Sequence, residues 1–187
     1  MPRLGLDTDA VVTAAARLAD QDGLAHLTLA RLAAELGIRT PSLYAHVDGL
    51  PDLRARLAAR GAQELTAALR VAAAGRSGID ALRSVAIAYR EYAHAHPGTY
   101  AATQVPSDRE ENQAAAREIV ALMVAVLDGY GLEGDDVIHA VRAVRSALHG
   151  FVGLEREGGF ALSVSAAESY ERLIEMISTG LSANLYQ

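Results

Sequence analysis

Cysteine, lysine and tryptophan are absent from this chain of 187 residues. Without cysteine there is no disulfide, no thiolate nucleophile and no Cys-ligated metal site. Proline is scarce, with 5 residues, and aromatic residues amount to 7 Tyr and 2 Phe, whereas Ala and Leu number 38 and 24. Ala and Leu favour helices, and no segment alternates apolar and polar residues as a strand does. We therefore expect an all-α protein.

Long apolar runs are missing as well. The longest, Ile119–Leu127, has nine residues, whereas a membrane-spanning helix needs about 20. The first ten residues include Asp7 and Asp9 and lack the apolar centre of a secretion signal. We therefore expect a cytoplasmic protein that makes no contact with a membrane.

Positive charge comes from arginine alone and is unevenly placed. The formal net charge is −6, from 17 Arg and 23 acidic residues. Residues 1–60 hold 7 Arg and 7 acidic residues, so the rest of the chain carries the whole negative charge. This asymmetry indicates that an anionic partner would dock at the amino-terminal part.

Glycine, proline and N-cap residues divide the chain into helices. Asp7 or Thr8 is a suitable N-cap for a helix that stops at Gly23, and Thr28 for a short helix up to Leu36. Thr40 is expected to cap a third helix, with Pro41 at its first position. Further helices are predicted at 51–74, 79–96, 99–104, 108–130, 135–157 and 165–185. The Gly-rich segment 75–78 predicts a boundary, which gives a front domain 1–50, a connecting helix 51–74 and a body 75–187.

The last two helices each carry an apolar stripe along one face. Such a pair favours a four-helix bundle formed with the same pair from a second chain, and packing within one chain is the alternative. We expect a homodimer. The predicted interface residues are Val141, Val144, Leu148, Phe151, Ile174, Ile177 and Leu181; Leu185 continues the second stripe.

Two short helices joined by Gly37-Ile38-Arg39 have the spacing of a helix-turn-helix, which lays its second helix in the major groove of DNA. The segment Leu27–Ile38, followed by Thr40-Pro41-Ser42-Leu43-Tyr44-Ala45-His46-Val47, closely resembles the DNA-binding signature of the tetracycline-repressor (TetR) family over about residues 8–57. The resemblance implies three amino-terminal helices that bind double-stranded DNA. It further implies a larger body that supplies a dimer interface and a small-molecule pocket.

The residues of this segment also have direct physical interpretations. Side chains at the start of the third helix reach base edges, and Arg39 reaches a phosphate or a guanine. By the resemblance, Tyr44 and His46 reach the DNA backbone. Tyr44 in the core of the small domain is the alternative, as is a purely capping role for Thr28. The predicted DNA-binding residues are Thr28, Arg31, Arg39, Thr40, Pro41, Ser42, Tyr44 and His46.

Three positions depart from the family pattern, and one of them is Pro51, which replaces a more usual polar residue at the start of the fourth helix. Ala30 and Leu50 are apolar, where many members carry Arg or Lys for base and phosphate contacts. Arg31, Arg39 and Arg54 compensate in part. This departure keeps a second hypothesis open, namely a helical small-molecule-binding or scaffold dimer with little or no affinity for DNA.

The body resembles a TetR subgroup named for a Trp-His-Gly motif. The run Ser146–Phe151, followed by a Glu and then Gly158-Gly159-Phe160, carries this likeness, with Leu148 in place of the Trp. Aromatic rings, a thioether and hydroxyls on two body helices are typical of an apolar ligand pocket, although they also occur in ordinary cores. The predicted effector-binding residues are Tyr89, Tyr92, His96, Tyr100, Met123, Tyr130 and His139.

Motifs of enzymes are not found. The chain has no Gly-x-Ser-x-Gly, no dinucleotide fingerprint and no phosphate-binding loop. His139 and His149 share a helical face but have no acidic partner nearby, which makes a poor metal site. We therefore expect a ligand-responsive repressor that binds a palindromic operator as a homodimer, that is not an enzyme and that needs no cofactor or metal.

Overall fold

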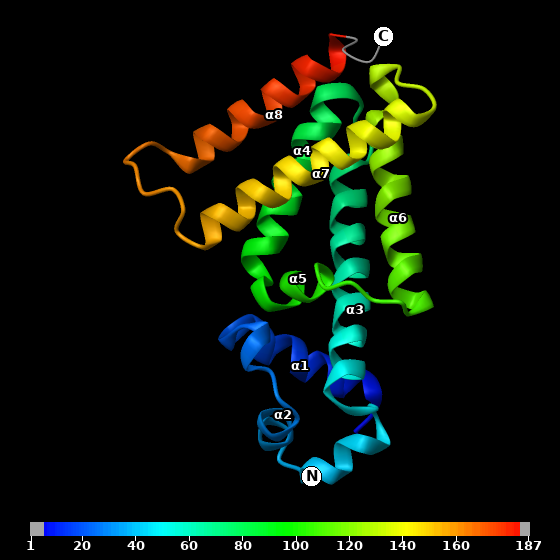
Figure 1. The fold of residues 1–187 in the computed structure, drawn as a ribbon, viewed down its shortest axis with the longest axis vertical. Coiled ribbons are helices and arrows are strands. Elements are labelled where there is room, and N and C mark those ends of the chain that lie inside the picture. Colours follow the sequence, from blue (N-terminus) through cyan, green and yellow to red (C-terminus); the bar gives the residue numbers. More distant parts are fainter. Residues whose placement is uncertain (1–5, 184–187) are drawn as a thin grey trace. The chain divides into compact units, whose positions relative to one another are not determined.

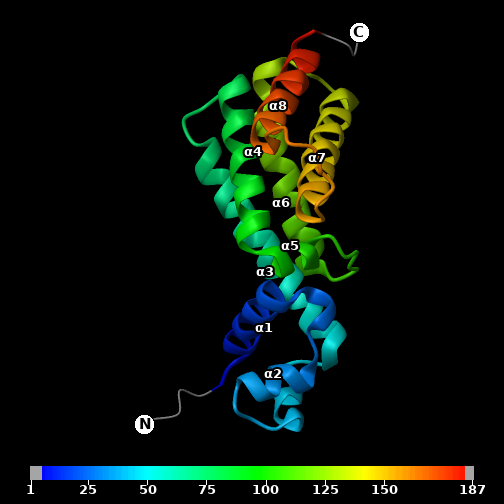
Figure 2. The same ribbon diagram turned by 90° about the vertical axis from the view of Figure 1, so that its left-hand side faces the viewer.

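The computed structural model describes residues 6–183, and its regular elements there are all helical, which confirms the predicted all-α class (Figures 1 and 2). The longer helices are α1 (Thr8–Asp22), α3 (Gly49–Ala73), α4 (Gly78–Ala95), α6 (Glu110–Leu127), α7 (Asp135–Arg156) and α8 (Ala166–Ser182). The short elements are α2 (Leu29–Glu35), α5 (Pro97–Thr103) and the 3-10 segments η1 (Leu24–His26), η2 (Thr40–Ala45) and η3 (Asp128–Tyr130). Within the described residues, no helix combines the length and apolar character needed to cross a membrane.

The chain forms two compact units. Among the described residues, unit 1 comprises 6–64 and 95–116, and unit 2 comprises 65–94 and 117–183. Helices α3 and α6 each continue from one unit into the other. Unit 1 therefore contains α5 and the first turns of α6 in addition to the amino-terminal helices. The glycine, proline and N-cap residues along the sequence do not indicate this grouping of distant segments.

Local capping explains the first helices of unit 1. The Asp7 carboxylate accepts a hydrogen bond from the Ala10 amide at 2.8 Å, and the Thr28 hydroxyl accepts one from the Arg31 amide at 3.2 Å. Helix α2 ends in a Schellman motif, in which the Gly37 and Ile38 amides donate to the carbonyls of residues 34 and 33. Gly37 has a φ of 65°, which glycine adopts without strain.

The third predicted helix is a shorter element than expected. Thr40 does not cap it: Arg39 occupies the N-cap position and makes no side-chain capping bond. The element is the 3-10 segment η2, and six residues are too few to gain much from α-helical hydrogen bonds. Helix α3 then begins at Gly49, two residues before the predicted start, and the Asp52 carboxylate accepts from the Asp48 amide at 3.0 Å.

Buried leucine side chains from α2, η2, α3 and the segment before α2 form much of the core of unit 1. Leu32, Leu43, Leu53 and Leu57 have no exposed surface, and Leu27 is almost completely buried. Burial of each such side chain stabilises the fold by about 1.5–3 kcal/mol relative to exposure. The short elements α2 and η2 are therefore held in place by packing, because their own length gives them little stability.

Helix α5 is tied to α1 within unit 1. The Asp20 carboxylate of α1 accepts hydrogen bonds from the amides of Gly98 and Thr99, at 2.9 and 2.7 Å. The Nδ1 atom of His96 lies 3.3 Å from the same carboxylate. A Cβ on Gly98 would lie 1.9 Å from the Ala19 carbonyl oxygen. Glycine at this position thus permits the close approach that lets Asp20 cap α5.

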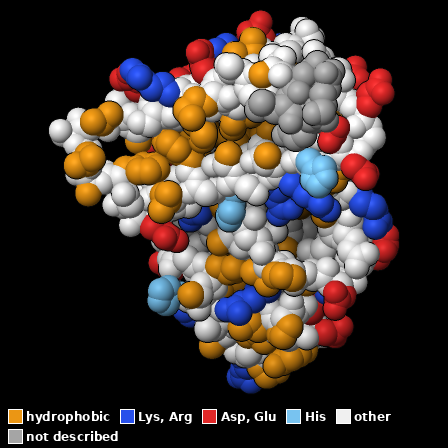
Figure 3. Space-filling model, turned by 45° about the horizontal axis from the view of Figure 1, so that its top comes forward, with side chains coloured by type: hydrophobic (Ala, Val, Ile, Leu, Met, Phe, Trp, Pro, Cys, Tyr) orange, Lys and Arg blue, Asp and Glu red, His pale blue; other side chains and the backbone are white. Residues whose placement is uncertain are grey.

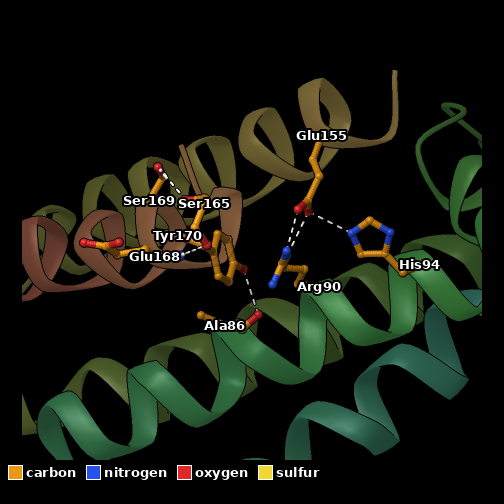
Figure 4. A network of polar contacts seen from close by, with 8 residues as sticks. All are labelled: Ala86, Arg90, His94, Glu155, Ser165, Glu168, Ser169 and Tyr170. Atoms are coloured by element: carbon orange, nitrogen blue, oxygen red, sulfur yellow. Dashed lines mark hydrogen bonds and ion pairs between the residues drawn. The ribbon is translucent and has the colours of Figure 1, made fainter. Parts of the chain in front are cut away.

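In unit 2, polar contacts join α4 to α7 and α8 (Figure 4). The Tyr170 hydroxyl donates to the Ala86 carbonyl at 2.7 Å, and the Arg90 guanidinium lies 5.4 Å from the Tyr170 ring centroid. Arg90 also pairs with Glu155 through two nitrogens, and His94 contacts the same carboxylate at 2.7 Å. The hydrogen bond from Arg90 is the main reason that the pKa of Glu155 falls to about 2, against a smaller opposing effect of burial.

Candidate nucleic-acid interface

Segment η2 packs one side chain into the core and exposes most of the others to solvent. Leu43 is completely buried, while Pro41, Ser42 and Tyr44 are exposed. Tyr44 retains 59% of its surface, which excludes the core position that the sequence left open for it. The buried Leu43 fixes the segment, so that three side chains able to contact bases or phosphates stand on its outer side.

The charged residues near η2 differ in their availability. Arg39 is exposed and pairs with no carboxylate in residues 6–183. Arg31 is also exposed, but its guanidinium lies 2.5 Å from the Asp22 carboxylate and 3.4 Å from the His26 carbonyl. Among the predicted DNA contacts, Arg39 therefore offers an uncompensated charge and Arg31 a compensated one.

The remaining predicted DNA-binding residues lie around the same two short elements. Thr28 is exposed at the start of α2, where its hydroxyl is used as the cap. Thr40 and His46 are half-buried at the two ends of η2, and the His46 carbonyl accepts a 3.4 Å hydrogen bond from Thr8. The structure thus places all eight predicted residues on α2, η2 and their immediate flanks, in unit 1.

Comparison with known proteins supports a regulatory role for these elements. Residues 82–177 match the model of tetracyclin repressor-like C-terminal domains. YobS of Bacillus subtilis, an uncharacterized HTH-type transcriptional regulator, is 36% identical over 98% of this chain and 96% of its own length. The chain belongs to the TetR family. Its helix-turn-helix therefore serves DNA binding and the regulation of transcription.

Two further comparisons agree with this TetR assignment. The uncharacterized HTH-type transcriptional regulator Rv0681 of Mycobacterium tuberculosis is 43% identical over 82% of this chain and 72% of its own length. The crystal structure of a possible TetR family regulator from Streptomyces coelicolor A3(2) superposes with a TM-score of 0.74. That structure is 18% identical, and the match covers 95% of this chain and 99% of that one. It is a match of fold. The likeness to the Trp-His-Gly subgroup stays a prediction.

The predicted effector-binding residues of this TetR member fall in both units. His96 and Tyr100 belong to unit 1, whereas Tyr89, Tyr92, Met123, Tyr130 and His139 belong to unit 2. Tyr89, Tyr92, Tyr100 and Met123 are buried, and His139 is exposed. The hydroxyl of the half-buried Tyr130 lies 2.8 Å from that of Ser178. A hollow lined by residues of α4 and α8, including Ile87, Arg90 and Glu171, contains none of the seven.

The predicted dimer residues pack within the single chain. Val144 and Ile174 have no exposed surface, and Val141, Leu148 and Leu181 retain 5% or less. Phe151 and Ile177 are half-buried, and the Phe151 ring lies 4.9 Å from that of Tyr170, centroid to centroid. The two stripes thus form part of the core of unit 2 within one chain. In a dimer, the partner would contact other side chains, which are exposed in the single chain.

Five large apolar side chains on α7, on α8 and in the segment 157–165 between them are exposed. We call the α7–α8 apolar patch the set Leu154, Phe160, Leu162, Val164 and Met176, whose exposed fractions range from 39% to 82%. Figure 3 shows hydrophobic side chains on the projecting part of the molecule where α7 and α8 are joined. Large exposed apolar patches often mark interaction sites.

Sequence reasoning missed Asp20 and the cluster around Asp52. Helix α5 begins at His96-Pro97-Gly98 with no local side-chain cap, and a helix start without a cap is the signal that an acid from elsewhere supplies one. Asp52 accepts from Arg56 at 2.9 Å and also pairs with Arg109. Burial raises the pKa of Asp52, but hydrogen bonds from Arg109, Arg56 and the Asp48 amide outweigh it, and the pKa falls to about 2.

Proposed function

We propose that this protein is a homodimeric repressor that binds a palindromic operator in the cytoplasm and leaves it when a small, largely apolar effector binds. The observation that carries the proposal is the exposed row on η2, where Pro41, Ser42 and Tyr44 stand outside a core that holds Leu43. No part of the core has to open for this row to reach a duplex. In a helix-turn-helix the second element enters the major groove.

Within this proposal the side chains have separate tasks. Thr40, Pro41 and Ser42 read base edges, with Pro41 against a thymine methyl group and the hydroxyls as hydrogen-bonding groups. Thr28, Arg39, Tyr44 and His46 hold the phosphates, which set the register but carry little sequence information. Arg31 contributes less than Arg39, because binding a phosphate requires it to leave Asp22.

Dimerisation supplies the second recognition element. The α7–α8 apolar patch supports a homodimer, since its side chains otherwise remain exposed to water. A two-fold axis would present two copies of η2 to two half-sites, which is why the operator is expected to be palindromic.

The effector acts, in this proposal, on the unit that contains the DNA-binding elements. Two predicted effector residues, His96 and Tyr100, belong to unit 1, where His96 contacts Asp20 of α1. Helix α3 also joins both units as one continuous element. A molecule that shifts α5 or α3 changes the separation of the two recognition elements in the dimer. It releases DNA only in proportion to its different affinity for the two arrangements.

Selection of bound sequences from a random duplex pool tests the repressor proposal. We expect a palindromic site whose affinity falls as salt rises. Arg39→Gln should reduce the slope of log affinity against log salt by about one unit, and the matched Arg31→Gln by clearly less. If no duplex is preferred over random DNA, the alternative of a ligand-binding dimer without operator affinity replaces the repressor.

Effector control is tested by linkage. A coupling of about 1–3 kcal/mol weakens operator binding by roughly 5- to 150-fold, and the operator must weaken effector binding by the same factor. Effector affinity measured with and without operator checks this. Transcription in vitro from a promoter that overlaps the selected site tests repression itself, because a bound dimer should lower transcript yield and the effector should restore it.

A further inference from the structure

A hollow of about 720 Å³ lies within unit 1, lined by residues of η1, the start of α3, α5 and the segment that joins α5 to α6. Most of its lining is apolar and includes Leu24, Leu50, Ala58, Ala102 and Val105. Its volume is in the range of small-molecule sites. None of the effector residues predicted from the sequence lines it.

Arg54 is the arginine of this lining whose charge lacks a partner of opposite sign among the described residues. Its Nη2 atom donates to the Leu24 carbonyl over a long 3.4 Å, and its Nε is buried without a hydrogen-bond partner. No carboxylate pairs with it in the part of the chain that the structure describes. A half-buried guanidinium beside apolar side chains is unfavourable while it lacks a counter-charge.

The other charges of the lining do not supply that counter-charge. Asp52 is occupied by Arg109, by Arg56 and by the Asp48 amide. Asp48 is exposed to solvent, so water and salt screen its carboxylate. Of the two arginines in the lining, Arg109 is therefore neutralised and Arg54 is not.

We propose that this hollow is a second ligand site, which binds a small amphipathic acid. The carboxylate of the acid pairs with the Arg54 guanidinium, and its apolar body lies against Leu24, Ala58 and Ala102. Charge-assisted hydrogen bonds between guanidinium and carboxylate are strong and directional. A neutral apolar molecule would leave Arg54 unpaired, and a cation would be repelled by it. The site does not depend on the proposed operator or effector, since its binding is measured on the protein alone.

Because the natural chain has no cysteine, a single introduced thiol reports occupancy of the hollow. Ser107, which lines the hollow and is half-buried, is replaced as Ser107→Cys, a nearly isosteric change. The matched control is Ser77→Cys, which is exposed and belongs to unit 2. The rate of reaction with a thiol reagent is measured with octanoate below its micelle concentration, and with 1-octanol as the neutral probe of equal chain length.

Octanoate should slow modification of the Ser107→Cys thiol in a saturable manner, by about tenfold when its concentration is ten times its dissociation constant. It should leave the Ser77→Cys thiol unaffected. Adding Arg54→Gln should abolish the protection, and adding Asp48→Asn should strengthen it by removing a like charge. Titration calorimetry of octanoate into the natural chain and into Arg54→Gln should give the same ranking without any thiol.

Three outcomes would overturn the proposal. Octanol protecting as well as octanoate would mean that the hollow is merely apolar. Protection that persists in Arg54→Gln would place the carboxylate elsewhere. Absence of both protection and calorimetric binding, in variants whose thermal unfolding matches that of the natural chain, would mean that the hollow is not a ligand site.

Discussion

Adjacent residues of η2 have opposite environments, and substitutions should separate their roles. Tyr44 is 59% exposed, whereas Leu43 has no exposed surface. We expect Tyr44→Ala to weaken binding to all duplexes by about tenfold, the effect of one lost phosphate contact of about 1.4 kcal/mol. Its melting temperature should stay unchanged. Leu43→Ala should lower the free energy of unfolding by about 2–5 kcal/mol.

Fluorescence anisotropy with a selected duplex and thermal unfolding check this pair of variants. Equal losses of stability in the two would contradict the division of η2 into an inner and an outer side. A change of preferred sequence in Tyr44→Ala would contradict its assignment to phosphate.

Glu155 should make stability depend on pH. Its pKa is lowered to about 2, principally by the Arg90 hydrogen bond, from an ordinary value of 4.5. Because the folded-state pKa is the lower one, the stabilisation is present above about pH 5 and declines as the pH falls towards 2. We expect Glu155→Gln to lower the free energy of unfolding by about 1–3 kcal/mol at pH 7.

Urea unfolding between pH 2 and 7 measures the Glu155 effect. The difference between Glu155→Gln and the natural chain should shrink as the pH falls, while the exposed Glu157→Gln should change stability by no more than about 0.5 kcal/mol at pH 7. A difference that stayed constant down to pH 2 would contradict an ionic origin.

At the scale of elements, the close approach of α5 to α1 leaves no room for a side chain at Gly98. A methyl group at Gly98 would overlap the Ala19 carbonyl, whereas a Cβ at Gly150 of α7 meets no atom within 4 Å. We expect Gly98→Ala to destabilise the protein by about 2 kcal/mol or more, because backbone has to move. Gly150→Ala should stabilise it by about 0.5–1 kcal/mol through helix propensity.

Urea unfolding of the two glycine variants gives the comparison directly. If Gly98→Ala were as stable as the natural chain, α5 would not pack against α1 as closely as described, and the capping of α5 by Asp20 would lose its support.

At the scale of the whole molecule, the α7–α8 apolar patch should hold two copies together. Met176 is 71% exposed on α8, and Val71, on α3, is 76% exposed outside the patch. A stable dimer buries at least about 1,200 Å² in total. We expect Met176→Glu to give folded monomers and the matched Val71→Glu to leave the dimer intact. Leu148→Arg should instead lose folded protein, because Leu148 is 2% exposed in the single chain.

Light scattering at micromolar concentration, together with circular dichroism, distinguishes dissociation from unfolding in these variants. A natural chain that is monomeric at such concentrations would end the dimer proposal, and with it the expectation of a palindromic operator.

Local sequence signals predicted most of the helix starts and stops. Asp7 and Thr28 cap α1 and α2 as expected, and Gly37 ends α2 with the predicted sharp turn. The residues that resemble the TetR signature lead to the family that the comparisons show. Capping and helical periodicity act over only a few residues, so they can be recognised without knowledge of the fold.

Packing between distant segments determined which partner each buried or polar side chain contacts. Periodicity identified the stripe of Val144 and Leu148 as apolar but not which partner would cover it, and unit 2 covers it from within one chain. Likewise, Asp20 lies 78 residues before the Gly98 amide that it caps, and only the tertiary structure leaves Arg54 without a carboxylate beside an apolar hollow. An amino-acid sequence determines which residues seek burial or a partner, whereas three-dimensional packing determines which partner each one meets.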